Sequence, residues 1–190
     1  MHTPLEWVAA ISIGLGLAAA TGFRVFLPLL MAGVASRIGA LPLADGFGWL
    51  SSTEALVALT AASFFETTAY YIPGVDHLLD VLAGPAAFVA GIVASASVMT
   101  DFPPAVMWPV AIIGGGGLAA TTKVTSALVR AKTSIATLGL GNPIVSTVET
   151  GGAILIAALA ILIPIICLAM VLVLLVWVLR RRRRAAAAVP

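Results

Sequence analysis

Long apolar stretches separated by short polar segments dominate this chain. Five of them approach or exceed the length of about 20 residues that a helix needs to cross a bilayer. Charges, prolines and turn residues bound these stretches, which run over residues 5–38, 54–72, 81–100, 105–128 and 153–179. The pattern predicts an all-α fold, a polytopic membrane helical bundle of about five spans with broken or re-entrant helices.

The first stretch is too long for one straight spanning helix. Its 34 residues would extend about 51 Å at a helical rise of about 1.5 Å per residue, against a hydrocarbon core of about 30 Å. Proline removes a backbone donor and clashes with the preceding turn, so we expect a bend between Gly22 and Pro28. The second piece then lies along the interface or re-enters the membrane. Pro164 interrupts the last stretch in the same way.

Short strings recur in the same order in the two halves of the chain. The matched pairs are Gly16–Thr21 with Gly117–Thr122, residues 39–42 with 140–143, and Ser51–Glu54 with Ser146–Glu149. We interpret residues 5–73 and 104–164 as pseudo-repeats linked by the span 81–100, within one transmembrane domain over residues 1–179. If each repeat contributes two spans, the second enters the membrane from the opposite side, and the two superpose about an axis in the membrane plane. Such an inverted repeat is common among transporters, whose sites lie on broken helices at the repeat interface.

Composition supports a membrane location. The chain is 61% hydrophobic and 9% charged, and its mean hydropathy is +1.14. A soluble domain has roughly a quarter of its residues charged, so lipid is the solvent for most of this surface. The same figures exclude a disordered chain, a fibre, a disulfide scaffold and a nucleic-acid binder. The single cysteine, Cys167, lies in an apolar run and forms no internal bridge.

Positive charge is concentrated at the C-terminus. The formal net charge of +2 falls to −3 without one run of five arginines. That run consists of Arg180, Arg181, Arg182, Arg183 and Arg184. A polybasic run directly after an apolar segment is typical of a cytoplasmic flank, and it also contacts anionic lipid headgroups. We expect a multi-pass protein of the cell inner membrane with residues 180–190 as a cytoplasmic tail. The lipid bilayer is its expected partner, nucleic acid is not, and a homo-oligomer stays open.

Two further features bear on topology. Residues 1–6 contain no Lys or Arg and carry an acid, unlike the basic start of a signal peptide, so we expect the first segment to remain as a membrane helix. With five spans and a cytoplasmic tail, the loop holding Arg130 and Lys132 falls outside, against the positive-inside rule. Either residues 138–148 re-enter the membrane, or these cations serve a site.

Arg24 and Glu66 are ionisable groups within apolar segments. Placing such a group inside the membrane costs several kcal/mol, so we expect each one to form an ion pair or to serve a function. Arg24 either snorkels, locks a bent helix through an ion pair, or holds an anionic substrate with help from backbone N–H groups freed at Gly22. Glu66 either pairs with Arg24 or Lys123, or serves as a proton-coupling site.

A second group of polar residues lies in the second half. Lys123 and Arg130 are seven residues apart, two turns along one helix face. Glu149 is expected to begin the last helix, where it either caps free N–H groups or joins a site. Residues 138–143 form either an ordinary turn or a re-entrant loop that lines a cavity. The candidate substrate- or ion-binding residues are Arg24, Glu66, Lys123, Arg130, Asn142 and Glu149.

Other motifs carry weaker chemistry. Gly114–Gly117 is not a phosphate loop, since no strand precedes it and no Gly-Lys-Ser/Thr follows, so we expect it to serve close helix packing. Asp76, His77 and Asp80 are more typical of a solvated loop or helix start than of a metal site. We find no nucleophile with a base at readable spacing. The sequence therefore predicts no enzyme, no cofactor and no bound metal.

The polar residues and the strings around them carry a resemblance to a known family. These are Gly22-Phe-Arg24-Val-Phe-Leu-Pro28-Leu-Leu, Glu66, Ile72-Pro73-Gly-Val-Asp76, Lys123, Arg130, Gly141-Asn-Pro143, Ser146 and Glu149. Over residues 14–164 the chain resembles the bacterial membrane family catalogued as domain of unknown function 4126. The resemblance implies a multi-span inner-membrane protein and supplies no established activity.

The favoured function is a secondary transporter or permease with an intramembrane Arg/Glu/Lys site for a small anionic or headgroup-like substrate. The alternatives are a non-catalytic structural or assembly protein, whose buried charges hold helices together, and a lipid-headgroup flippase. A closed and fully paired charge cluster indicates assembly, a cavity that reaches one face indicates transport, and a cavity open sideways to lipid indicates a flippase. In each case we expect Arg24 within ion-pair or one-water distance of Glu66 or Glu149.

The basic tail gives the first testable prediction. A reporter fused after residue 190 should be active only in the cytoplasm, because the five arginines at 180–184 outweigh every other loop charge in setting orientation. Paired cytoplasmic and periplasmic reporters measure this, with a chain in which the five arginines are replaced by glutamine as the comparison. A fusion active only in the periplasm would contradict the assigned orientation.

Overall fold

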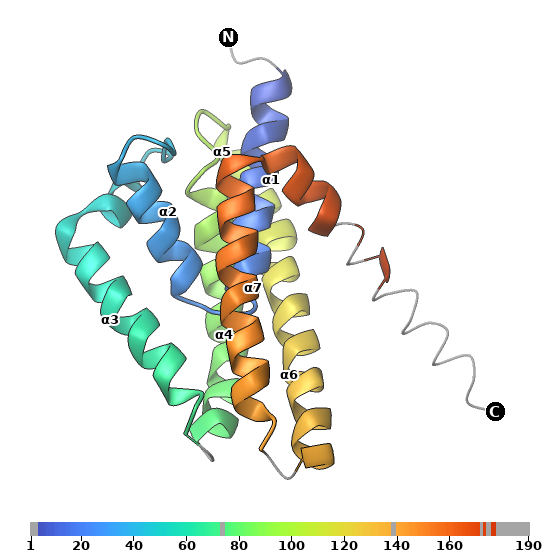
Figure 1. Cartoon of the computed structure of the whole chain (residues 1–190). Coiled ribbons are helices and arrows are strands. Elements are labelled where there is room, and N and C mark those ends of the chain that lie inside the picture. The colour runs from blue at the N-terminus through green and yellow to red at the C-terminus, as the bar shows by residue number, and fades with distance from the viewer. Residues whose placement is uncertain (1–3, 73–74, 138–139, 172, 174–175, 178–190) are drawn as a thin grey trace.

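The computed structural model describes residues 4–72, 75–137, 140–171, 173 and 176–177, without the side chains of 75–78, 80 and 81. Every regular element in these ranges is helical, which confirms the all-α class (Figure 1). In chain order the elements are α1 (Pro4–Thr21), α2 (Leu27–Arg37), a 3-10 turn η1 (Gly48–Ser51), α3 (Thr53–Ala69), α4 (Val75–Ala96), α5 (Pro104–Pro109), a π-helical segment η2 (Val110–Gly116), α6 (Gly117–Thr137) and α7 (Asn142–Leu162).

Proline and serine mark several helix starts. Pro28, Pro104 and Pro143 lie in the first turns of α2, α5 and α7, where the missing N–H has no intrahelical partner to lose. Ser52 caps α3, since its Oγ accepts a hydrogen bond from the Ala55 amide at 3.1 Å. These local signals fix where the helices begin and therefore which side chains face the bundle interior.

The predicted break in the first stretch is confirmed. The helix α1 ends at Thr21 and α2 begins at Leu27, and α2 turns back toward the end of the molecule from which α1 starts (Figure 1). A Cβ at Gly22 would meet the backbone carbonyl oxygen of Ala119 and the side chain of Thr122, so glycine lets this turn lie directly against α6. We call residues 22–26 the break segment. It places non-helical backbone near mid-height in the bundle.

The long helix formed by α5, η2 and α6 packs against α4 through small residues. A Cβ at Gly115 would meet the Cβ of Ser95 and the backbone oxygen of Gly91, both on α4. The glycines of η2 therefore serve close helix packing. The tight contact positions α6, which carries two of the candidate cations.

Three helices among the described residues are long and apolar enough to cross a membrane, by length and composition: Pro4–Thr21, Pro104–Thr137 and Asn142–Leu162. The other two predicted spans correspond to α3, with 17 residues, and to α4, whose described apolar part is the shorter helix Leu82–Ala96. The count of five spans therefore stays a prediction.

The last predicted span has different boundaries from those expected. Residues 142–148 are not a separate re-entrant loop, because α7 begins at Asn142 and runs as a regular helix to Leu162. The predicted start at residue 153 is wrong because Pro143 already supplies a helix start. Helix resumes at residues 164–171 after a break at Ile163, and it leaves α7 at a sharp angle (Figure 1). Pro164 causes this bend, since it lacks the N–H that would continue α7.

The arrangement does not confirm the inverted repeat. Gly16–Thr21 ends a helix, whereas Gly117–Thr122 begins one that continues to Thr137. The helices that hold these strings, α1 and α6, run in the same direction (Figure 1), while an inverted repeat requires opposite directions. The break segment explains why the two helices run in the same direction. It reverses the chain once more in the first half, whereas α6 continues without a turn.

The polybasic tail at 180–190 lies outside the described residues, as do the side chains of Asp76, His77 and Asp80. Their predicted roles stay predictions.

The packing of η2 yields the second prediction. Gly115→Ala should destabilise the fold by about 1–3 kcal/mol, because the added methyl pushes α4 away from η2. Gly117→Ala is the matched control, since a Cβ there meets nothing within 4 Å and should be neutral or stabilise by up to about 1 kcal/mol. Thermal unfolding in detergent compares the two, and equal melting temperatures would refute the packing argument.

Candidate functional site

Five charged side chains are buried among the described residues. They are Arg24, Glu66, Lys123, Arg130 and Glu149, and all were predicted from sequence as candidate site residues. The break segment, α3, α6 and α7 supply them. Their contacts with one another and with Tyr70 bring them into one group, which we call the charge cluster.

Arg24 is held by α7. Its side chain is completely buried, and its Nη2 donates to the backbone oxygen and the Oγ of Ser146 at 2.9 and 2.5 Å. Its Nε donates to Thr150 Oγ1 at 2.9 Å, and Nη2 lies 3.9 Å from Glu149 Oε2. The predicted ion pair of Arg24 is therefore confirmed, with Glu149 as the partner, and the snorkelling interpretation is wrong because the guanidinium points into the bundle.

Glu66 binds the start of α2. Its carboxylate accepts hydrogen bonds from the backbone amides of Val25 and Phe26 at 2.8 and 3.2 Å. These amides lie where α2 begins, and a helix N-terminus favours a negative charge. A residue of α3 therefore caps α2 in place of a side chain of α2 itself.

Glu149 bridges α7 and α6. Its carboxylate accepts hydrogen bonds from Arg130 Nη2 and from Ser126 Oγ. The interpretation of Glu149 as a helix cap is wrong, because α7 begins at Asn142 and Glu149 lies two turns further on. At that depth its carboxylate faces α6 and not the free amides of its own helix.

Tyr70 joins the three cations. The guanidinium carbons of Arg24 and Arg130 each lie 4.3 Å from the centre of its ring. Lys123 Nζ lies 5.1 Å from the same centre and donates to the phenol oxygen at 2.9 Å. Cations at such distances are attracted by the ring, most strongly where water is excluded. One aromatic side chain therefore helps three like charges to lie close together.

Two other polar residues lie apart from the cluster. Asn142 is buried at the start of α7, where its Oδ1 accepts a hydrogen bond from Ser134 Oγ at 2.9 Å. This bond ties α6 to α7 about 10 Å along the helix from Glu149. Lys132 is exposed, whereas Arg130 is buried against Glu149. Arg130 thus supports the explanation that this cation serves a site rather than topology.

One donor of the cluster is left without a bond. Among the described residues the cluster holds three buried cations and two buried carboxylates. Arg24 Nη1 is buried with no hydrogen-bond partner among them. The geometry therefore favours negative charge in this region.

Comparison with known proteins identifies the family. A family described as domain of unknown function (DUF4126) matches residues 11–184. The chain belongs to this family. No curated protein and no solved structure matches this chain.

The charged residues that carry the DUF4126 resemblance lie at the charge cluster, whereas Asn142 lies apart from it. Gly22 and Arg24 form the break segment against α6 and α7. Ser146 and Glu149 are on the face of α7 that meets Arg24. The part of this DUF4126 sequence that stands out in an apolar chain is thus the part that builds the cluster.

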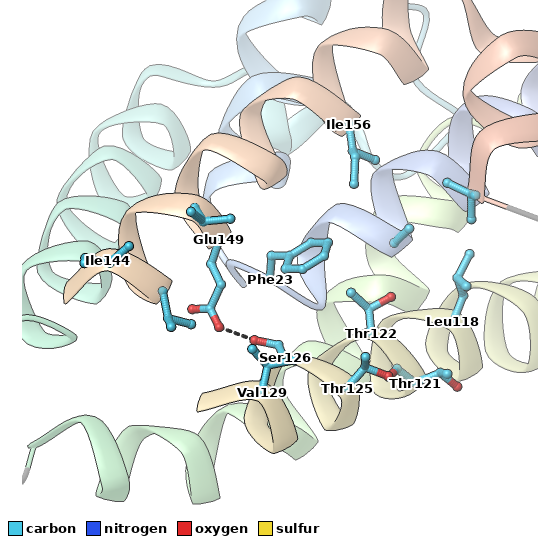
Figure 2. Close-up of a pocket in the computed structure, with 14 residues that line it drawn as sticks. Phe23, Leu118, Thr121, Thr122, Thr125, Ser126, Val129, Ile144, Glu149 and Ile156 are labelled. Atoms are coloured by element: carbon cyan, nitrogen blue, oxygen red, sulfur yellow. Dashed lines mark hydrogen bonds between the residues drawn. The ribbon is translucent and has the colours of Figure 1, made fainter. Parts of the chain in front are cut away.

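Two cavities flank the charge cluster of this DUF4126 chain. The first, of about 360 Å³, lies between α1, α6 and α7 and has Glu149 and Ser126 in its wall. In Figure 2 the Glu149 side chain reaches from α7 to Ser126 on α6, beside Phe23. The second, of about 370 Å³, lies between the start of α2, α3 and α4 and has Glu66 and Tyr70 in its wall. No group of three or more His, Cys, Asp or Glu that suits a metal occurs among the described residues.

Sequence reasoning missed the neutral members of the site. Tyr70, Ser126 and Thr150 were not candidates, because hydroxyl groups in apolar helices are common and carry no charge. The spacing of Tyr70 held a signal, since it lies one turn after Glu66 and so shares its helix face.

The aromatic centre of the cluster gives the third prediction. Tyr70→Phe should lower the free energy of unfolding by about 1–2 kcal/mol, since it removes the hydrogen bond to Lys123 and keeps the ring. Tyr70→Leu should lower it by at least about 2 kcal/mol more, because three buried cations lose their aromatic partner. Reversible unfolding in mixed micelles measures both.

Tyr71→Phe is the control for these variants. Its hydroxyl contacts Thr147 at an exposed position, so we expect a change within about 0.5 kcal/mol. Equal losses for Tyr70→Phe and Tyr70→Leu would show that the ring face contributes nothing.

Proposed function

We propose that this protein is a secondary transporter or permease of the cell inner membrane for a small anionic substrate. Arg24, Lys123 and Arg130 are the cations that attract the substrate. The protein spans the membrane several times, has a cytoplasmic C-terminus and is not an enzyme. The observation that carries the proposal is the completely buried guanidinium of Arg24, whose Nη1 has no hydrogen-bond partner in the part of the chain that the structure describes.

The buried guanidinium of Arg24 favours function over simple helix pairing. Burying an ion costs several kcal/mol, and structural pairing offsets this cost only when its hydrogen-bond donors are satisfied. Arg24 Nη1 is buried with no hydrogen-bond partner among the described residues. The positive field of the cluster selects the sign of a substrate, because an anion gains energy where a cation or neutral molecule does not.

The break segment supports the same proposal. Transporters bind substrates where helices are interrupted inside the membrane, since the backbone groups freed there face the site. The chain has such an interruption between α1 and α2, next to Arg24. The proposal uses this broken helix and does not depend on the repeat.

An assembly protein is the second candidate. It is favoured because both carboxylates already accept hydrogen bonds from the protein. Backbone amides donate to Glu66, and side chains donate to Glu149. A flippase is the third, favoured by the side of the first cavity that carries the exposed residues Ile144 and Val148. Uptake of soluble anions separates transport from both.

Uptake into proteoliposomes gives the fourth prediction. The full chain should take up at least one of labelled phosphate, sulfate and lactate above protein-free vesicles. Arg24→Lys keeps the charge but loses the fork geometry, so uptake should fall about tenfold, the equivalent of about 1.4 kcal/mol, while the fold is retained. Arg24→Ala should impair folding itself, by about 3–5 kcal/mol, because Glu149 loses a buried partner.

Lys132→Gln is the matched control. It removes an exposed cation two residues from Arg130 on the same helix, and uptake should not change. If none of the three anions enters, and Arg24→Lys lowers stability, the assembly protein becomes the better explanation. Movement of labelled lipid between leaflets without uptake of soluble anions would favour the flippase.

A further inference from the structure

The two carboxylates of the cluster are held in different ways. Glu66 is bound by the backbone amides of Val25 and Phe26, which are fixed by the turn of the chain. Glu149 is bound by the side chains of Arg130 and Ser126. Side chains change rotamer without moving helices. Glu149 is therefore the displaceable carboxylate of the pair.

Glu149 also lies at the boundary between the cations and a cavity. The cavity of about 360 Å³ has its carboxylate in the wall, and Figure 2 shows that side chain reaching toward α6. Arg24 and Arg130 contact this carboxylate but are not in the cavity wall. An anion that enters the cavity therefore reaches the arginines only by replacing Glu149.

The cavity is suited to an alkyl chain. Its wall is formed mainly by apolar side chains, with threonine hydroxyls of α6 along one side. The wall residues Ile144 and Val148 are 70% and 69% exposed, so the cavity is reached from the outer surface of the bundle. Its volume of about 360 Å³ is at the lower end of the roughly 300–1,000 Å³ of small-molecule sites.

The charges around Glu149 come from three other elements. The break segment brings Arg24, α6 brings Arg130 and Lys123, and α3 brings Glu66, with Tyr70 directly after its end. A Glu149 carboxylate that left the arginines would have no cation in the apolar cavity. A bare carboxylate there is costly, and it takes up a proton instead.

We propose that the carboxylate of Glu149 occupies the place of the substrate's own anionic group. A monoanion with a single alkyl chain enters the cavity, and its oxyanion replaces Glu149 on Arg130 and Arg24. One proton from solution binds the released carboxylate, which becomes a carboxylic acid. One anion and one proton enter together, so the formal charge of the cluster does not change. This inference rests on the proposed function and names its substrate class and its coupling.

The class of substrate follows from the group that it replaces. Glu149 is itself a carboxylate on a short apolar stem, and the planar forks of arginine bind carboxylate and sulfonate oxygens alike. The apolar wall then holds the chain beyond the anionic group. We commit to a free single-chain anion rather than a two-chain phospholipid, because the cavity is small.

Octanesulfonate is the probe that tests the coupling, since it remains an anion from pH 6 to 8. Any proton taken up on binding must therefore bind the protein. Isothermal titration calorimetry of the full chain in phosphatidylcholine nanodiscs, in two buffers with different heats of ionisation, counts these protons. We expect about one proton per bound anion and a Kd that rises up to about tenfold for each unit of pH. Empty nanodiscs correct for partition into lipid.

Glu149→Gln supplies the decisive comparison. The amide keeps the shape and takes up no proton, so octanesulfonate should bind without proton uptake and with a Kd that does not depend on pH. Glu54→Gln, an exposed carboxylate in the first turn of α3, should behave as the unmodified chain. The same proton count in Glu149→Gln as in the unmodified chain would overturn the proposal.

Two further results would overturn parts of the proposal even if Glu149→Gln failed to fold. Binding of octanesulfonate by the unmodified chain without proton uptake would remove the coupling. If methanesulfonate binds as tightly as octanesulfonate, the substrate class with an alkyl chain is wrong. If phosphatidylglycerol in the nanodisc abolishes the binding of octanesulfonate, the site belongs to a lipid headgroup instead.

The outcomes separate this inference from the proposed function. Uptake of phosphate, sulfate or lactate that depends on Arg24, together with no proton-linked binding of octanesulfonate, would leave the transporter and remove the inference. Loss of both the uptake and the binding would remove the transporter as well.

Discussion

The burial of Arg24 is the constraint on which the rest of the structure depends. A guanidinium is never deprotonated in a protein, so it must be bonded wherever it is buried. Its hydrogen bonds go to Ser146 and Thr150 on α7, which fixes the break segment against that helix. The turn then presents its free amides to Glu66, and this contact draws α3 onto the start of α2. One cation thus determines how three segments meet.

Tyr70 solves the problem that this arrangement creates. Three cations close together repel one another. The ring of Tyr70 offers each cation an electron-rich face without adding a further charge. The ring therefore allows the three cations to share one region of an apolar bundle.

The differing bonds of the two acids give the cluster a fixed part and a movable part. Backbone amides hold Glu66, so its displacement would undo the start of α2. Side chains hold Glu149 at the edge of a cavity. This difference connects the packing of the bundle to the proposed function, because a transporter needs a stable frame and a group that yields to its substrate.

The sequence by itself determined the helical class, the break after Thr21 and the five charged residues that are buried, since a charge or a proline in an apolar run stands out whatever the tertiary structure. It did not determine the start of α7 or the partner of Arg24. Tyr70 and the direction of α6 relative to α1 were likewise decided by the tertiary structure. The physical reason is sequence separation: Arg24 bonds to a residue 122 positions away. Only the packing of whole helices decides which of several suitable acids and hydroxyls comes within bonding distance.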